Sequence, residues 1–230
     1  MRGKLIVIEG GDGSGKTTQL MLLDQGLRKA GYAVENMHFP KHESQFGKVV
    51  DAYLRGELGK KEDLPSEFIA MLYMSDFYDS KKYMEELLEK GTIILLSRYF
   101  SSTLSFQVAL EKKEKEFVWN WIRLVASRLP QPDLVIVLDV PINISKKFLD
   151  NINRAETYKR GEKKDQHETD LVFQQAVREE YERNIKRLYW TRVKCYEKGE
   201  MLSIDKIHAL VWKETMDTIT GGKKLNGFFQ

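Results

Sequence analysis

Apolar residues along the chain form short continuous runs, separated by longer stretches in which they recur with helical spacing. Three runs, bounded by polar residues, Gly or Pro, lie at 5–8, 92–96 and 134–138; a more mixed apolar stretch lies at 33–39, and a weaker strand candidate lies at 201–204. Such continuous runs are typical of parallel strands that helices cover on both faces. Helical spacing follows at 15–29, 44–54 and 65–88. The order of elements therefore predicts an α/β fold with an open parallel sheet.

The length of 230 residues predicts a single domain that spans residues 1–230, and the composition predicts that it is globular. Hydrophobic residues make up 42% of the chain and charged residues 31%, which is too much apolar material for a disordered chain. The formal net charge is only +3, and no cluster of basic and aromatic residues forms a platform for bases. We therefore expect no nucleic-acid partner.

The single cysteine, Cys195, lies in a charged stretch that we predict to be helical. One cysteine cannot form an intramolecular disulfide, which favours a reducing compartment. The apolar run at 5–8 is too short for a signal peptide, and no run approaches the roughly 20 residues that a membrane span needs. We expect a cytoplasmic protein with no membrane partner.

Two segments are expected to be flexible. Residues 153–169 are polar and strongly charged around Gly161, which predicts a mobile loop between helices that start near Ile142 and Thr169. The terminal residues 221–230, GGKKLNGFFQ, are expected to form a frayed end without a function of their own.

Residues 10–17, GGDGSGKT, match the phosphate-loop motif G-x-x-x-x-G-K-[ST]. The motif follows a predicted strand and precedes a predicted helix, which is the context that it requires. Its glycines let successive backbone N–H groups turn towards phosphate oxygens. We predict that Lys16 reaches the β and γ phosphates and that Thr17 binds Mg²⁺. The expected ATP or GTP contacts are Gly10, Gly11, Gly13, Ser14, Gly15, Lys16, Thr17 and Thr18.

Beyond this loop the chain resembles the thymidylate kinases over about residues 3–210. The motifs that carry the resemblance are LIVIEGGDGSGKTTQ, Phe39-Pro40 with Gly47-Lys48, Arg98-Tyr99 with Ser102 and Gln107, and Gln131-Pro132-Asp133-Leu134 through Leu138-Asp139-Val140. The resemblance implies a five-stranded parallel sheet with a small lid and transfer of the ATP γ-phosphoryl group, with Mg²⁺, to a deoxynucleoside monophosphate. It also implies dTMP as the acceptor and a homodimer formed through helix faces around residues 65–90.

The resemblance assigns roles to individual residues. Asp12 matches the acid that approaches the acceptor sugar, and Arg98 matches the arginine that binds the acceptor phosphate. Segment 153–169 matches the lid, in which Arg160, or as second choice Arg154, is expected to stabilise charge on the transferring group; Arg154 is also expected to contact ATP. The expected catalytic residues are thus Lys16, Arg98, Arg160 and Asp12. The expected acceptor contacts are Asp12, Phe39, Pro40, Lys41, Phe68, Tyr73, Phe77, Arg98 and Gln107.

Three positions depart from the family pattern. Ser97 replaces the Asp before Arg98, which is expected to weaken Mg²⁺ positioning or to shift that task to Asp12 or Glu9. Phe77 replaces an arginine that contacts the base, and Phe77 cannot donate a hydrogen bond to a thymine carbonyl. Lys41 follows Phe39-Pro40 where the family often has an arginine, and it lacks bidentate geometry.

Three functional hypotheses remain open from the sequence. The first is a thymidylate kinase that tolerates the departures. The second is a kinase of the same fold with another nucleotide or nucleoside acceptor, which Phe77 favours. The third is a regulatory ATP-binding protein with a degraded acceptor site, and the presence of Arg98 and of a basic lid argues against it.

Overall fold

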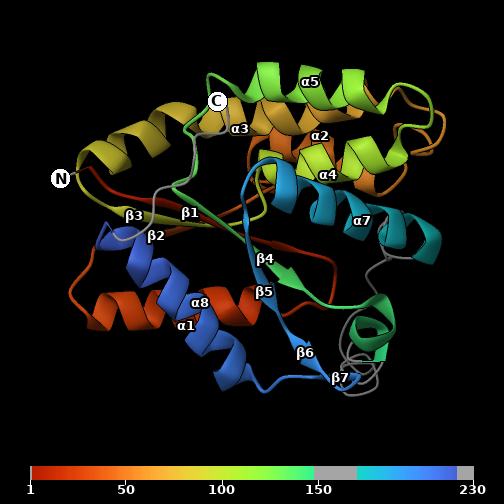
Figure 1. The fold of residues 1–230 in the computed structure, drawn as a ribbon. Helices are drawn as coiled ribbons and strands as arrows, with labels where there is room; N and C mark the ends of the chain where they lie inside the picture. The colour runs from red at the N-terminus through yellow and green to blue at the C-terminus, as the bar shows by residue number, and fades with distance from the viewer. Residues whose placement is uncertain (1, 148–169, 222–230) are drawn as a thin grey trace, which may run out of the picture.

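The computed structural model describes residues 2–147 and 170–221, which form an open five-stranded sheet between layers of helices (Figure 1). The strands are β1 Leu5–Gly10, β2 Val34–His38, β3 Ile93–Ser97, β4 Leu134–Asp139 and β5 Thr191–Lys194. They lie in the order β2-β3-β1-β4-β5, and every neighbouring pair is parallel. The predicted five-stranded parallel sheet is therefore confirmed.

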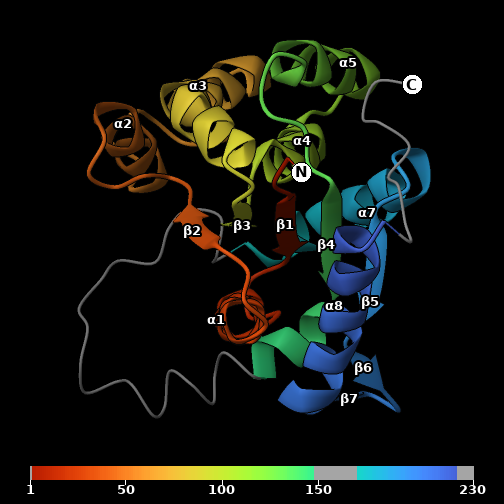
Figure 2. The same cartoon turned by 90° about the vertical axis from the view of Figure 1, so that its left-hand side faces the viewer.

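Helices cover both faces of this sheet, as the continuously apolar strands require. One face carries α1 Lys16–Lys29 and α8 Ile204–Ile219, which pack against each other (Figures 1 and 2). The other face carries the larger set, α3 Ser66–Glu89, α4 Phe100–Leu110, α5 Lys115–Ala126 and α7 Leu171–Arg187, with α2 Gln45–Leu54 beside α3. Each layer encloses its own cluster of buried side chains against the sheet.

The strand order brings the segments that follow β1, β3 and β4 together at the C-terminal ends of the strands, which form one edge of the sheet. β1 lies between β3 and β4, with Ile8 opposite Ser97 and Gly10 opposite Leu138. The C-terminal ends of these three strands therefore meet, and ligands of open α/β sheets bind outside such ends. This edge carries the glycine-rich loop after β1, Arg98 after β3 and Asp139 at the end of β4.

The prediction that residues 201–204 form the last strand of the sheet is wrong. The fifth strand is β5, whose Thr191 and Val193 are buried while Arg192 and Lys194 are exposed. This alternation is typical of an edge strand with one face in solvent, but charged residues at alternate positions also fit a helix surface. For this reason the sequence pattern predicts a helix for the segment that includes Cys195, and this prediction is also wrong.

The residues that follow β5 form a small hairpin instead. β6 Tyr196–Glu197 pairs antiparallel with β7 Glu200–Met201, and α8 begins at Ile204. Cys195 lies between β5 and β6 and is buried.

Other predicted boundaries agree with the structure to within a few residues. Ser44 caps α2 by accepting a hydrogen bond from Gly47 N at 2.8 Å, and a cis peptide joins Phe39 to Pro40 just after β2. Residues 142–147 are helical. The predicted mobile loop at 153–169 and all of the predicted tail beyond Gly221 lie outside the described residues. In the described part of the chain, none of the helices has the length and apolar character to cross a membrane.

Candidate active site

The glycine-rich loop has the backbone geometry of an anion site. Gly10, Gly13 and Gly15 adopt φ angles of 142°, 72° and 89°, which L side chains rarely adopt. A Cβ on Gly10 would also lie 2.8 Å from Leu138 O. Since α1 begins at Lys16 immediately after Gly15, its free N–H groups and positive dipole end face the loop.

The side chains of the loop are arranged for phosphate. Lys16 Nζ donates to Gly10 O at 3.2 Å and to Gly11 O at 2.9 Å, so its ammonium lies across the loop. Ser14 is buried, and its hydroxyl has no hydrogen-bond partner among the described residues. Thr17 and Thr18 occupy the first turn of α1. The loop contacts predicted from the motif therefore lie together at one helix end.

The residues at this edge can hold Mg²⁺ through few protein ligands. Thr17 is exposed at the start of α1. Within 2–147 and 170–221, no three His, Cys, Asp or Glu side chains form a group that could bind a metal on its own. Mg²⁺ usually keeps several waters and takes one or two protein ligands together with substrate phosphates. A single hydroxyl beside the phosphate loop fits this ion.

The carboxylates near the loop are engaged with protein donors. Glu9 is fully buried and accepts four hydrogen bonds, and Asp139 pairs with Arg178 at 2.9 Å and with Arg192 at 3.0 Å. Glu9 therefore does not face a ligand, and the expectation that it replaces the acid missing at Ser97 is wrong.

Asp12 and Arg98 form the centre of the site. Arg98 Nη2 donates to Asp12 Oδ1 at 2.5 Å, and Gln174 Nε2 donates to Asp12 Oδ2 at 3.0 Å. Burial alone would lower the pKa of the Arg98 guanidinium, but the charges of Asp12 and of nearby Glu9 raise it above its ordinary value. Arg98 is a quarter exposed, so it carries a permanent positive charge that a ligand can reach.

A pocket adjoins the phosphate loop on the side of α3 and α4. Its lining combines aromatic rings with a few polar and charged groups. The lining residues are Asp12, Phe39, Pro40, Leu54, Tyr73, Phe77, Arg98, Tyr99, Ser102, Thr103, Phe106 and Gln107. Because Asp12 belongs to both the loop and the pocket, a ligand in the pocket lies next to the end of a triphosphate chain bound by the loop.

Phe77 is both a core residue and part of this pocket. Its ring meets Phe39 edge to face at 4.8 Å and Tyr99 at 5.0 Å, and it is only 1% exposed. These packed rings form an apolar wall, against which a planar ring can pack. Gln107 is 1% exposed, and its Oε1 has no hydrogen-bond partner among the described residues. A buried amide oxygen without a partner is costly unless a ligand supplies one.

Two expected acceptor contacts do not line the pocket. Phe68 is 37% exposed, and it lies on the opposite side of α3 because nine residues at 100° each separate it from Phe77 by half a turn. The expectation for Phe68 is therefore wrong. Lys41 is half-buried, and its backbone N–H donates to Asp76 Oδ2 at 2.8 Å. Arg154, Arg160 and the lid lie outside the described residues.

Three side chains on α7 reach the phosphate loop and its neighbouring strand ends, and the sequence analysis did not identify them. Gln174 contacts Asp12, Arg178 contacts Asp139 and Tyr181 contacts Glu9. Their spacing of four and three residues places them on one helix face. Polar residues on the buried face of a predicted helix were the only local signal for these long-range contacts.

We predict that Asp76→Asn stabilises the fold at neutral pH. Burial raises the pKa of Asp76, although hydrogen bonds from Lys41 N and Ser44 Oγ oppose this. A raised pKa means that the folded state holds its proton more tightly than the unfolded state, so wild-type stability falls as pH rises above the ordinary value of about 3.9. Asparagine carries no charge, and its single oxygen can accept from Lys41 N while its NH2 group donates to Ser44 Oγ, which reverses the direction of that hydrogen bond.

Urea unfolding of wild type and Asp76→Asn between pH 4 and 8 measures this effect. The gap in stability is expected to grow with pH and then to level off. A variant that is less stable than wild type at every pH would contradict the prediction, and Asp76→Ala, which loses both hydrogen bonds, serves as the destabilised control.

The sheet order, the loop and the adjoining pocket define a protein of the P-loop nucleotide kinase fold. The family model for thymidylate kinase matches residues 8–202, and the chain belongs to the thymidylate kinase family. It is 35% identical over 144 residues to a thymidylate kinase of Schizosaccharomyces pombe, covering 63% of this chain and 64% of that relative. It is 30% identical over 181 residues to one of Danio rerio, covering 79% of this chain and 76% of that relative.

A solved structure supports the same fold. A thymidylate kinase from Candida albicans superposes with a TM-score of 0.71 at 23% identity, and the match covers 98% of this chain and 96% of that one. The alignment with the S. pombe relative spans just under two thirds of that relative's length.

Proposed function

We propose that this protein transfers the γ-phosphoryl group of ATP to dTMP, giving ADP and dTDP. The observation that carries the proposal is the position of Asp12, which belongs to the phosphate loop and also lines the adjoining pocket. A donor bound by the loop and an acceptor bound in the pocket then meet end to end. Membership of the thymidylate kinase family supports thymidine as the acceptor nucleoside.

In this proposal the chain acts by positioning and by charge. The Arg98 guanidinium binds the acceptor phosphate, and the Asp12 carboxylate accepts a hydrogen bond from the sugar 3′-hydroxyl. Lys16 and the loop N–H groups bind the donor phosphates, and Thr17 would hold Mg²⁺, which would neutralise part of their charge. The acceptor phosphate oxygen is already anionic, so the transfer requires no general base.

Gln107 is our candidate for recognition of the base edge. Phe77 occupies the helix position at which the family has a base-contacting arginine, and a phenyl ring offers no donor. The Gln107 amide on α4 also lines the pocket, and its buried oxygen lacks a partner among the described residues. An amide can accept the thymine N3–H and donate to a carbonyl oxygen.

We predict that Gln107→Leu raises KM for dTMP by about 30-fold, because the polar edge of the base is left buried without partners. KM for ATP is expected to stay within twofold. Gln131→Leu is the matched control, since Gln131 Oε1 is also buried and has no partner in the described part of the chain, but lies outside the pocket. Steady-state kinetics on both variants decides the point. An unchanged KM for dTMP in Gln107→Leu would remove Gln107 from the base site.

We also propose a homodimer that forms through α3. Phe68, Met71 and Tyr78 are large exposed apolar side chains on this helix, and their spacing of three and seven residues gives one stripe. Phe117 and Leu124 continue the apolar surface on the adjacent α5. Contiguous exposed apolar surface of this kind marks an interaction site.

Light scattering is expected to give twice the 26.8 kDa chain mass for the wild type. Met71→Arg is expected to give the monomer mass, because a buried unpaired charge opposes association. Met21→Arg, at an exposed methionine of α1 on the opposite face of the sheet, is expected to remain dimeric. A dimeric Met71→Arg variant would exclude the α3 surface.

Product analysis tests the proposed reaction. With γ-labelled ATP, Mg²⁺ and dTMP, the label is expected in the β position of dTDP. Release of the label as inorganic phosphate alone would mean that the protein hydrolyses ATP and does not transfer the group.

A further inference from the structure

Arg98 occupies a strained backbone conformation in the turn between β3 and α4. Its φ angle of 66° lies in the left-handed region, which non-glycine residues adopt only when the surrounding structure holds them there. Two backbone N–H groups of this turn donate hydrogen bonds to residues of β1. Arg98 N donates to Ile8 O at 3.3 Å, and the next amide, Tyr99 N, donates to Glu9 Oε1 at 3.2 Å.

The Glu9 carboxylate is itself fixed by side chains from two helices. Ser101 Oγ donates to Oε1 at 2.5 Å, Ser102 Oγ to Oε2 at 2.6 Å and Tyr181 OH to Oε2 at 2.8 Å. Glu9 and Tyr181 are both buried, and a buried carboxylate is tolerated only with such a set of donors. Glu9 therefore connects three elements by hydrogen bonds: the Arg98 turn, the start of α4 and Tyr181 on α7.

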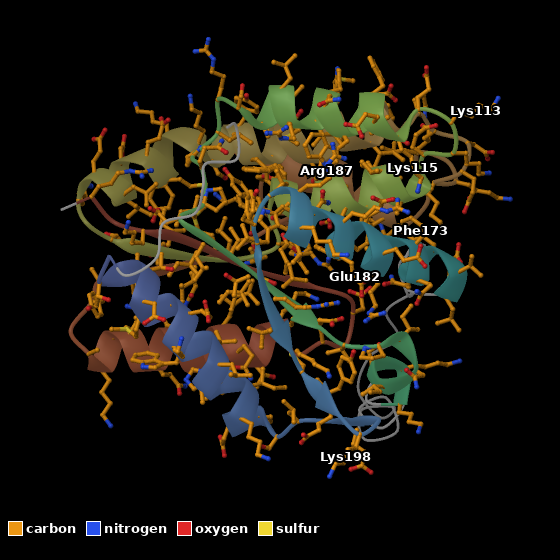
Figure 3. All side chains as sticks on the ribbon, in the orientation of Figure 1. Lys113, Lys115, Phe173, Glu182, Arg187 and Lys198 are labelled. Atoms are coloured by element: carbon orange, nitrogen blue, oxygen red, sulfur yellow. The ribbon has the colours of Figure 1, made fainter. Side chains whose placement is uncertain are left out.

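The guanidinium end of Arg98 leads to the same helix. Arg98 pairs with Asp12, and Gln174 on α7 holds the second oxygen of Asp12 at 3.0 Å. Gln174 and Tyr181 are seven residues apart, two helical turns on one face. Figure 3 labels Phe173, Glu182 and Arg187, which follow α7 along its length. One helix thus constrains both the backbone and the charged end of Arg98.

We propose that Glu9 and Tyr181 are positioning residues, which hold the Arg98 turn so that its guanidinium is aligned with the acceptor phosphate before the substrate binds. This inference rests on the proposed role of Arg98 in acceptor binding. Neither residue lines the pocket, so their contribution passes through Arg98. Preorganised charge lowers the barrier because the site does not have to rearrange during the reaction.

Tyr181→Phe tests the proposal by removing one donor from Glu9 without changing the ring. We expect kcat/KM for dTMP to fall about tenfold, a coupling within the range measured for residues that share a network. KM for ATP is expected to stay within twofold. Tyr83→Phe is the matched control, because Tyr83 OH also donates to a glutamate, Glu35, but at the exposed surface; its kcat/KM should equal that of wild type.

A double-mutant cycle separates positioning from a general structural role. In an Arg98→Ala background, Tyr181→Phe is expected to change kcat/KM for dTMP by less than about twofold, since the residue through which it acts is gone. A tenfold loss in both backgrounds would overturn the proposal and leave Tyr181 as a stabilising residue. If Arg98→Ala alone leaves kcat/KM for dTMP unchanged, the proposed role of Arg98 fails and this inference fails with it.

Ser101→Ala provides the second route if Tyr181→Phe does not fold. It removes a different donor from the same carboxylate, and Ser101 is buried outside the pocket lining. The same cycle with Arg98→Ala is expected to show the same loss of effect. Additive effects of Ser101→Ala and Arg98→Ala would overturn the proposal.

Discussion

Lys16→Ala is expected to lower kcat by about 1,000-fold, the upper range for removing one preorganised charge or donor from a transition state. The Lys16 ammonium lies within 3.2 Å of two carbonyl oxygens of the phosphate loop, which we propose binds the terminal phosphates of ATP. Lys16 is the only basic residue within 10–17, so no other side chain of the loop itself can replace the lost charge.

Lys29→Ala is the matched control for this prediction. Lys29 lies in the last turn of the same helix, exposed and away from the loop. The activity of the Lys29→Ala variant should therefore equal that of wild type. Thermal unfolding of both variants establishes that they are folded. Activity of Lys16→Ala within tenfold of wild type would mean that residues 10–17 do not bind the transferred phosphate.

Arg98→Ala is expected to lower kcat/KM for dTMP by about 1,000-fold, because it removes the acceptor phosphate contact and leaves Asp12 with one partner fewer. Arg98→Lys is expected to recover only part of this loss, since an ammonium cannot bind two oxygens in the planar geometry of a guanidinium. KM for ATP should change little in either variant.

Arg28→Ala controls for the loss of an arginine–aspartate pair. Arg28 pairs with Asp24 at 2.7 Å on the surface of α1, outside the pocket, and its replacement should leave kcat/KM for dTMP unaltered. If Arg98→Lys were as active as wild type, a point charge would suffice and the bidentate contact would be contradicted.

The parts of this structure that the sequence predicted are those with a local pattern. The apolar runs that became β1 and β4 are buried at every position, and the loop between β1 and α1 is defined by consecutive residues. Edge strand β5 was not predicted, because its Arg192 and Lys194 face solvent. Charged residues at this spacing also occur on the exposed surface of a helix.

The parts of the site that the sequence did not predict depend on contacts between distant residues. Gln174 lies 162 positions from Asp12, and Tyr181 lies 172 positions from Glu9. The packing of α7 on the sheet determines these partners, and no local sequence motif predicts that packing. Phe68 and Phe77 illustrate the same limit, since both are phenylalanines on α3 and only Phe77 lines the pocket.

A comparison of acceptors tests directly whether the protein phosphorylates dTMP. The protein is mixed with ATP and Mg²⁺ and with each common nucleoside monophosphate and thymidine in turn, and kcat/KM is obtained from ADP formation above a control without acceptor. We predict the highest kcat/KM for dTMP. A higher value for another acceptor, or ATP binding without turnover on any acceptor, would contradict the account of the pocket formed by Phe77, Arg98 and Gln107.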